Sequence, residues 1–283
     1  MYQFPIGVMV DSFRQETHRA IETAAAMGVQ GLQMYCTTGE NAPEQLVGQK
    51  RKDLLQFVKD HGLVFSAICG DLGMGFGDAA RNPELIDRSK RIMELAKELE
   101  CDIVTTHIGV VPADPGHPRY GIMQQACFEL AQYADTMGSH FAIETGPETA
   151  QTLKRFLDSL GSTGVAVNLD PANLVMVTGD DPVAAVYTLK DYIVHTHAKD
   201  GIKLLDRDPE IIYGIIDHGG WDQEPAFREV PLGRGGVDFP GWLKALEDIG
   251  YRGFLTIERE CGETPADDIR LAAEFLKSVM AEN

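Results

Sequence analysis

The stretch SHFAIETGPETAQTLKRFLDSLG, residues 139–161, contains the unit from which the fold can be predicted. It begins with a short β-rich run at 139–145 and continues at 149–160 with apolar residues at the three- and four-residue spacing of a helix. Gly161 follows the helical pattern, where a glycine favours the left-handed turn that ends many helices. The stretch therefore predicts one strand followed by one helix.

This unit of strand and helix recurs along the chain of 283 residues. The predicted strands lie near 4–10, 31–36, 63–69, 102–108, 139–145, 165–170, 192–198 and 253–258. The predicted helices lie near 14–26, 44–60, 83–99, 121–137, 149–160, 181–190, 238–249 and 265–280. Eight such units, about 30 residues apart, predict an α/β fold of the (β/α)8 TIM barrel type, formed as a single domain over 1–283. A Rossmann sheet is not favoured, because no GxGxxG fingerprint follows an early strand.

One connection between these units is much longer than the others. About 36 residues, from Gly201 to Gly236, separate the seventh strand from the next helix, whereas such loops usually have about two to six residues. A long loop at this place would cover the C-terminal face of the barrel, where active sites are built. Its apolar residues, including Tyr213 and Trp221, favour a substrate-covering lid over a disordered surface loop.

The composition limits the partners of the protein. Its 25 lysines and arginines stand against 43 aspartates and glutamates, and the net charge of −18 opposes binding to nucleic acid. No stretch approaches the roughly 18 apolar residues of a membrane span, and the N-terminal residues lack the pattern of a secretory signal. The five cysteines are scattered without a CxxC pair, which suits reduced thiols. We therefore expect a cytoplasmic protein with a small-molecule substrate.

Four of the predicted strands end in polar residues that share the inward face. Alternate residues of a strand point to the same side, so Glu144, Asp170, His197 and Glu258 should all point into the barrel at its C-terminal end. Three carboxylates and one imidazole at the same level would repel one another strongly without a cation. The sequence therefore predicts that these four side chains bind one divalent metal ion.

The residue types also limit which metal would bind. Oxygen-rich ligation with one imidazole favours Mn²⁺ and also suits Mg²⁺, while Co²⁺, Fe²⁺ and Zn²⁺ are alternatives. A single one of these residues would more often be a cap or a solvated charge, but four in phase favour a common site. His195 is predicted one layer below His197, either supporting the site or as a buried core histidine. His107, at the end of the fourth strand, is predicted to bind substrate or to have a structural role.

Five motifs carry a resemblance that covers nearly the whole chain. They are AICGDLG at 67–73, IETG at 143–146, NLDPANL at 168–174, HTHAKDG at 195–201 and VPLGRGGVDFPGWLKALEDIGYRGFLTIERE at 230–260. With these motifs the sequence resembles the xylose-isomerase-like TIM-barrel superfamily, and within it the sugar phosphate isomerase/epimerase family. The last motif is the most specific of the five.

The resemblance implies a reaction and roles for particular residues. By analogy with the family, Glu144, Asp170, His197 and Glu258 are the metal ligands, and Glu144 and Glu258 also form an acid/base pair on opposite sides of the substrate carbon. Such a pair would remove a proton next to a carbonyl and form a metal-stabilised enediolate. The implied enzyme is a divalent-metal-dependent isomerase or epimerase of a small sugar or related keto-polyol. Family habit further implies a homodimer or a homotetramer.

Further residues are expected to bind the substrate. Asn173 stands where many relatives have a histidine, so a neutral amide replaces a contact to metal or substrate. Lys199 either binds substrate or pairs with Asp200, and a Schiff-base aldolase mechanism through Lys199 ranks below enolisation. His218 belongs to the long loop that would shape the specificity. The complete set of substrate-binding candidates is His107, Asn173, His195, Lys199, Asp200 and His218.

Other functions of the same site stay open at this point. A dehydratase similar to inosose dehydratase would form the same enolate and then expel a β-hydroxyl group. A sugar-binding subunit would bind metal and sugar without turnover. The apurinic-site endonucleases of the superfamily are disfavoured, because Asn173 and the FREVPLG segment lack their additional metal ligands and because the net charge of −18 opposes DNA binding.

Overall fold

The stretch at 139–161 forms the strand and the helix that its sequence predicts. In the computed structural model, β5 (His140–Glu144) is followed by α5 (Ala150–Leu160). The side chain of Thr149 accepts a hydrogen bond from a backbone N–H of the first helical turn, and Gly161 ends the helix with a φ of 57°. Local capping therefore fixes both ends of α5.

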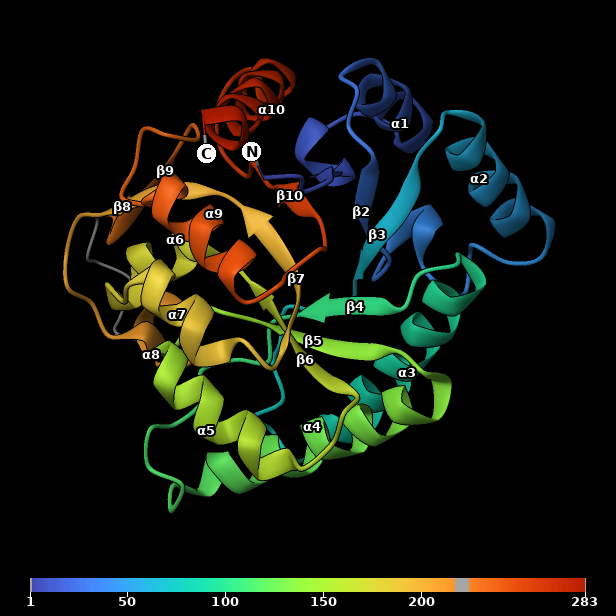
Figure 1. The fold of residues 1–283 in the computed structure, drawn as a ribbon. Coiled ribbons are helices and arrows are strands. Elements are labelled where there is room, and N and C mark those ends of the chain that lie inside the picture. The colour runs from blue at the N-terminus through green and yellow to red at the C-terminus, as the bar shows by residue number, and fades with distance from the viewer. Residues whose placement is uncertain (1, 217–223, 283) are drawn as a thin grey trace.

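Eight parallel strands close into a barrel (Figure 1). They are β1 (Ile6–Met9), β2 (Gly31–Tyr35), β3 (Val64–Cys69), β4 (Ile103–Thr106), β5, β6 (Val165–Leu169), β7 (Ile193–Ala198) and β10 (Leu255–Ile257). The order around the barrel is β1, β10, β7, β6, β5, β4, β3 and β2, and β2 pairs with β1. The structure describes residues 2–216 and 224–282. The prediction of a (β/α)8 TIM barrel is confirmed.

Helices cover the outside of the barrel (Figure 1). They are α1 (Thr17–Ala26), α2 (Gln49–Asp60), α3 (Asn82–Glu98), α4 (Pro118–Met137), α5, α7 (Pro182–Leu189), α9 (Phe239–Asp248) and α10 (Pro265–Glu282). The predicted start of α2 near residue 44 is wrong, because Gly48 has a φ of 56° and this left-handed conformation keeps the helix from beginning earlier.

None of the helices in residues 2–216 and 224–282 has both the length and the apolar character that a membrane span requires.

The hydrophobic core lies between the barrel and these helices. Phe141 of β5 packs from the barrel side, while Phe156 of α5 and Trp242 of α9 pack from the helical side, and each is at most 1% exposed. The barrel interior itself is narrow, because a Cβ atom on Gly7 would lie 2.8 Å from Thr256 Oγ1. Packing on both sides of the strands therefore fixes where their carboxyl ends lie.

The long connection after β7 has secondary structure of its own. β8 (Asp200–Lys203) pairs antiparallel with β9 (Phe227–Val230), and α8 (Pro209–Ile212) lies between them in sequence. The ring of Tyr213 packs edge to face against His107, with centroids 5.8 Å apart. The connection thus covers the carboxyl end of β4, as expected for a lid over this face. Residues 217–223, which include His218 and Trp221, lie outside the described residues.

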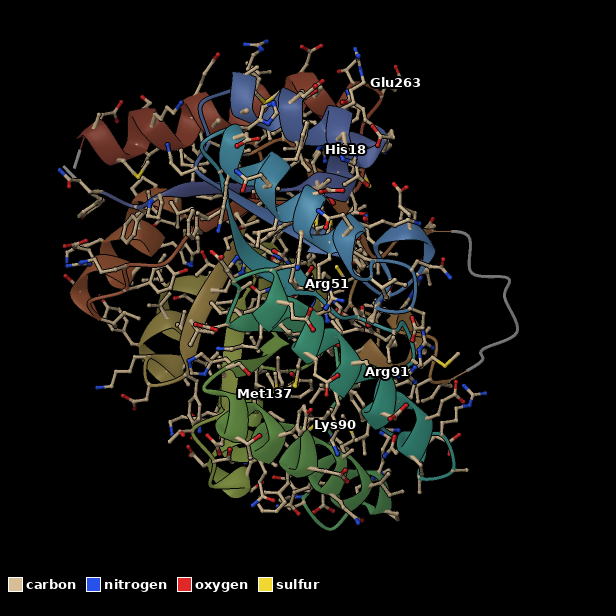
Figure 2. The ribbon with its side chains drawn as sticks, turned by 90° about the vertical axis from the view of Figure 1, so that its right-hand side faces the viewer. His18, Arg51, Lys90, Arg91, Met137 and Glu263 are labelled. Atoms are coloured by element: carbon tan, nitrogen blue, oxygen red, sulfur yellow. The ribbon has the colours of Figure 1, made fainter. Side chains whose placement is uncertain are left out.

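Charged side chains of the outer helices pair with one another and with a neighbouring turn at the surface. Lys90 Nζ lies 2.6 Å from Glu129 Oε1, and Arg91 Nη1 lies 2.9 Å from Glu44 Oε1. Figure 2 shows Lys90 and Arg91 on the helical surface of the molecule. Exposed pairs of this kind contribute at most about 1 kcal/mol each. The stability of the fold therefore rests on the core rather than on these pairs.

One buried carboxyl group gives the fold a pH dependence. Glu148 Oε2 accepts a hydrogen bond from the backbone N–H of Val111 at 3.2 Å, whereas Glu148 Oε1 has no partner among the described residues. Burial raises the pKa of Glu148 from 4.5 to about 8. The folded protein therefore keeps Glu148 protonated at neutral pH, while the unfolded chain would ionise it.

We expect the free energy of unfolding to fall as the pH rises from about 4.5 to about 8, by up to about 1.4 kcal/mol per pH unit. Glu148→Gln keeps a neutral side chain of the same shape and should remove this loss. In thermal unfolding, the variant should gain several degrees over wild type at pH 8 but not at pH 5. Glu22→Gln, on the exposed face of α1, is the control. It should leave the unfolding temperature unchanged at pH 8 and at pH 5. An equal gain at both pH values would contradict the assignment.

Candidate metal centre and active site

Four side chains converge at the carboxyl ends of strands that are neighbours in the barrel. Glu144 ends β5, Asp170 follows β6, His197 lies in β7 and Glu258 follows β10. Each offers one ligand atom, and these four atoms all lie within 4.8 Å of one another. All four residues are buried, and the most exposed of them is Glu144 at 7%. The structure thus brings together the four residues that the sequence predicts as metal ligands.

Gln33 of β2 sets the orientation of His197. The amide of Gln33 is itself fixed, because its Nε2 donates to Thr105 Oγ1 at 2.8 Å. His197 Nε2 lies 2.9 Å from Gln33 Oε1, which can only accept, and 3.2 Å from the amide nitrogen of Asn168, so the shorter contact favours the ring proton on Nε2. His197 Nδ1 then faces the carboxylates, 3.4 Å from Asp170 Oδ2 and 3.3 Å from Glu258 Oε2, where a neutral ring would offer its lone pair to a cation. Metal-binding histidines are commonly oriented by such a hydrogen bond at their other nitrogen.

The donor set fits a divalent cation. Asp170 Oδ2 and His197 Nδ1 are buried and have no hydrogen-bond partner in the described structure, although buried polar atoms are nearly always paired. Burial disfavours a charged imidazole, yet the carboxylates of Glu258 and Glu144 raise the pKa of His197 well above its ordinary value. The carboxylates therefore favour a positive charge at this place. A cation among these atoms would satisfy both unpaired atoms and offset the repulsion between the carboxylates.

Asparagine side chains fix Glu144. Asn173 Nδ2 donates to Glu144 Oε1 at 3.1 Å, and Asn168 Nδ2 donates to Glu144 Oε2 at 3.1 Å. Asn173 belongs to α6 (Pro171–Asn173), and its backbone N–H also donates to Asp170 Oδ1 at 2.9 Å. Asn173 therefore orients two of the proposed ligands at once. A π-helical turn at 174–178 follows it, a feature that often marks functional sites.

Lys199 holds Glu258 on the other side of the cluster. Lys199 Nζ donates to Glu258 Oε2 at 2.9 Å, pairs closely with Glu260 and lies 3.7 Å from Glu229 Oε2 of β9. Burial disfavours the charged ammonium, but the carboxylates around it raise the pKa of Lys199 well above its ordinary value. An ammonium group is not a nucleophile, so the raised pKa of Lys199 argues against the aldolase mechanism. Burial opposes ionisation of Glu258 too, yet His197 and Lys199 hold the pKa of Glu258 well below its ordinary value.

A cavity of about 270 Å³ lies over the cluster. Glu144 and Glu258 line it together with three of the predicted substrate-binding residues, His107, Asn173 and Lys199. His107 Nε2 lies 3.5 Å from Glu144 Oε1. Burial would lower the pKa of His107, but Glu144 and other nearby carboxylates raise it. The cavity therefore has both negative and positive groups on its walls.

Two other predicted substrate-binding residues, His195 and Asp200, are not brought to this cavity. His195 is fully buried, with Nδ1 2.9 Å from Asn168 Oδ1 and Nε2 2.8 Å from Thr256 Oγ1. Asp200 accepts hydrogen bonds from backbone N–H groups at 201, 235 and 237, and thus fixes the turn before α9. Neither side chain is among those that line the cavity, and His218 lies outside the described residues. Their binding of substrate stays a prediction.

Some residues of the site do not emerge as candidates from the sequence. Gln33 orients His197, and Asn168 binds Glu144. A polar residue inside the apolar strand GLQMY could have identified Gln33, and the inward phase shared with Asp170 could have identified Asn168. No comparable pattern points to Glu229, because its partners come from other parts of the chain.

The closed parallel barrel, with three carboxylates and one histidine at the carboxyl ends of its strands, defines a TIM-barrel protein with a candidate metal centre. Residues 21–279 match the family model of the xylose isomerase-like TIM barrel. The chain therefore belongs to the xylose isomerase-like TIM-barrel family.

Three known proteins show what the chain is similar to. It is 24% identical over 191 residues to inosose dehydratase of Lacticaseibacillus casei, a match that covers 59% of this chain and 62% of that protein. It is 23% identical over 249 residues to the putative L-ribulose-5-phosphate 3-epimerase SgbU of Escherichia coli strain K12, covering 82% of this chain and 80% of that protein. The crystal structure of the xylose isomerase domain protein from Planctomyces limnophilus matches with a TM-score of 0.80 at 24% identity, covering 99% and 97% of the two chains. The match thus spans less than two thirds of the dehydratase, and the structural likeness establishes the fold.

Proposed function

We propose that the protein is a divalent-metal-dependent isomerase or epimerase of a small sugar or related keto-polyol. The observation that carries the proposal is the convergence of Glu144 and Glu258 on one cavity, beside Asp170 and His197. Two carboxylates at one substrate carbon supply the base and the acid that isomerisation next to a carbonyl requires. The names of the similar proteins, an epimerase and a dehydratase, support a sugar or polyol as the substrate.

The first step removes a proton next to the substrate carbonyl and needs a base. A divalent cation held by Glu144, Asp170, His197 and Glu258, with Mn²⁺ as our first choice, would polarise the carbonyl oxygen of the substrate. Glu258 lines the cavity, and the ammonium of Lys199 favours its ionised form although burial opposes the charge. Glu258 is therefore the proposed base that removes the proton next to the carbonyl. The ammonium of Lys199 keeps the carboxylate in place through a hydrogen bond of 2.9 Å.

The second step returns a proton to the substrate. Glu144 is the proposed partner, and the amides of Asn173 and Asn168 hold its two oxygens at fixed positions. His107 Nε2, 3.5 Å from Glu144 Oε1, can resupply the proton. Delivery to the opposite face of the same carbon gives an epimer, and delivery to the neighbouring carbon gives an isomer.

A dehydratase is the second candidate and would share the first step. After loss of the proton next to the carbonyl, a hydroxyl group on the β-carbon would leave and would need a proton donor. His107 lines the cavity and is favoured in its charged form by the carboxylates near it, although burial opposes the charge. It could protonate the departing hydroxyl, and this placement keeps the dehydratase as an alternative.

Solvent exchange tests the proposal. The protein loaded with Mn²⁺ is incubated in D₂O with a panel of ketoses and keto-polyols, and NMR follows the products. We expect an isomer or epimer with deuterium at the carbon next to the carbonyl, whereas an unsaturated product would support the dehydratase. Binding of a sugar without exchange or product from any panel member would refute the enzyme and support a sugar-binding subunit.

A further inference from the structure

A second and larger cavity adjoins the one over the metal cluster. It has a volume of about 730 Å³, against about 270 Å³ for the inner cavity. Asp71, His107 and Tyr213 line both cavities, so the two meet at these three side chains. Clefts that hold drug-sized ligands have volumes of about 300 to 1,000 Å³. The outer cavity alone is thus large enough for a further group of the substrate, beyond the part that reaches the metal ligands.

The walls of the outer cavity are built by the loops after β3 and β4, by the first turns of α4 and by the segment after α8. Glycines contribute much of the lining and leave room where side chains would stand; they are Gly73, Gly75, Gly77, Gly109 and Gly214. A Cβ atom on Gly75 would lie 2.7 Å from the backbone oxygen of Ile108, so the two loops touch through their backbones. Met74 and Ile215, which are 59% and 40% exposed, add apolar surface, which suits the C–H faces of a sugar ring.

The charges of the outer cavity do not favour an anion. Arg81 and Arg119 are the arginines among its described lining residues, which include no lysine. Arg119 is paired with Glu210 of α8, and Arg81 Nε lies 3.5 Å from Asp78 Oδ2. Both guanidinium groups thus already have carboxylate partners. Where the two cavities meet, the imidazole of His107 lies 3.5 Å from Glu144 Oε1 and faces the same space as the carboxyl group of Asp71. A phosphate group is bound best by arginine donors that are free to form two parallel hydrogen bonds.

We propose that the substrate is an uncharged keto sugar that carries a second polar group about the size of another sugar ring, rather than a sugar phosphate. This inference rests on the isomerase or epimerase chemistry proposed above. The reacting ring lies in the inner cavity next to Glu144 and Glu258, and the second group lies in the outer cavity beyond His107 and Tyr213. The outer cavity therefore determines the specificity for glycosides of the reacting sugar.

Binding of unreactive polyols tests this inference without any turnover. Calorimetry on the Mn²⁺-loaded protein compares glucitol, mannitol and galactitol in three forms: free, with a glucosyl substituent, and with a phosphate. We expect at least one glucosyl hexitol to bind about tenfold or more tightly than its free hexitol, a difference of at least about 1.4 kcal/mol. The phosphate should give no such gain.

A matched pair of tryptophan variants locates the binding of the second group. Met74 lines the outer cavity and is 59% exposed, so Met74→Trp narrows the cavity without disturbing the core. It should remove most of the gain from the glucosyl group and leave the affinity for the free hexitol unchanged. Leu271→Trp, on α10 at 50% exposure, is the control. It should retain the full gain in affinity from the glucosyl group.

Several results would overturn the inference. The first is equal affinity for free and glucosyl hexitols, and the second is that no member of the panel binds. The third is that a hexitol phosphate binds more tightly than the free hexitol. The fourth is that Met74→Trp lowers the affinity for the free and the glucosyl hexitol equally. These outcomes are distinct from failure of the proposed function. A preference for glucosyl hexitols without proton exchange on any keto sugar would refute the proposed isomerase or epimerase activity but not the inferred ligand class. Proton exchange without that preference would refute the ligand class alone.

Discussion

Glu258→Gln should lower the rate of proton exchange next to the substrate carbonyl by a factor of about 10² to 10⁴, the usual contribution of a general base. The carboxylate lines the inner cavity and accepts a hydrogen bond from Lys199 Nζ at 2.9 Å. The amide oxygen of glutamine can accept the same bond and has the same volume, so the fold should be retained while the base is lost. The measurement is deuterium incorporation in D₂O with Mn²⁺ in excess.

Loss of the base must be distinguished from loss of the metal, because Glu258 is proposed for both roles. Metal content is therefore determined on the sample used for the exchange measurement. Glu263→Gln removes an exposed carboxylate at the periphery of the molecule (Figure 2) and should exchange at the wild-type rate. If Glu258→Gln retains both its metal and the wild-type rate, Glu258 is not the base.

The strand and helix pattern of the sequence predicts the barrel because both patterns are local. The alternation in FAIE and the helical spacing after it are enough to predict β5 and α5. Helix starts are harder to predict where the backbone takes an unusual conformation. Arg14 has a φ of 53°, and α1 begins only at Thr17 rather than near residue 14. The sequence does not indicate that Arg14 has a positive φ, since arginine rarely adopts this conformation.

The candidate ligands can be predicted for the same local reason, and their supporting residues cannot. Side chains alternate along each strand, so the phase of Glu144 or His197 follows from its own neighbours. The hydrogen bond between His197 and Gln33 joins residues that are 164 positions apart. This contact depends on β2 and β7 meeting across the closed barrel, a relation that no single segment of the chain contains. Glu229 reaches Lys199 only because β9 folds back onto β8.

Asp170→Asn should abolish tight metal binding while preserving the fold. Asp170 Oδ1 accepts a hydrogen bond from the backbone N–H of Asn173 at 2.9 Å, and an asparagine oxygen can keep it. Its Oδ2, which has no hydrogen-bond partner in the described structure, would become an NH₂ group without a lone pair for a cation. After dialysis, wild type should hold about one Mn²⁺ per chain and the variant almost none. A concentration of Mn²⁺ at 100 times its Kd should stabilise wild type by about 2.7 kcal/mol, and the variant should show no such gain in Tm.

Two further variants separate a ligand from a residue that only orients one. Gln33→Leu removes the acceptor for His197 Nε2 and should weaken metal binding by about 10- to 100-fold without abolishing it. Asp206→Asn, whose side chain is 98% exposed, should bind metal as wild type does. In metal-free protein, Asp170→Asn removes one of three crowded carboxylates, so its Tm should equal or exceed that of wild type. A lower metal-free Tm together with unchanged metal content would mean that Asp170 serves the fold rather than the metal, and would refute the proposed centre.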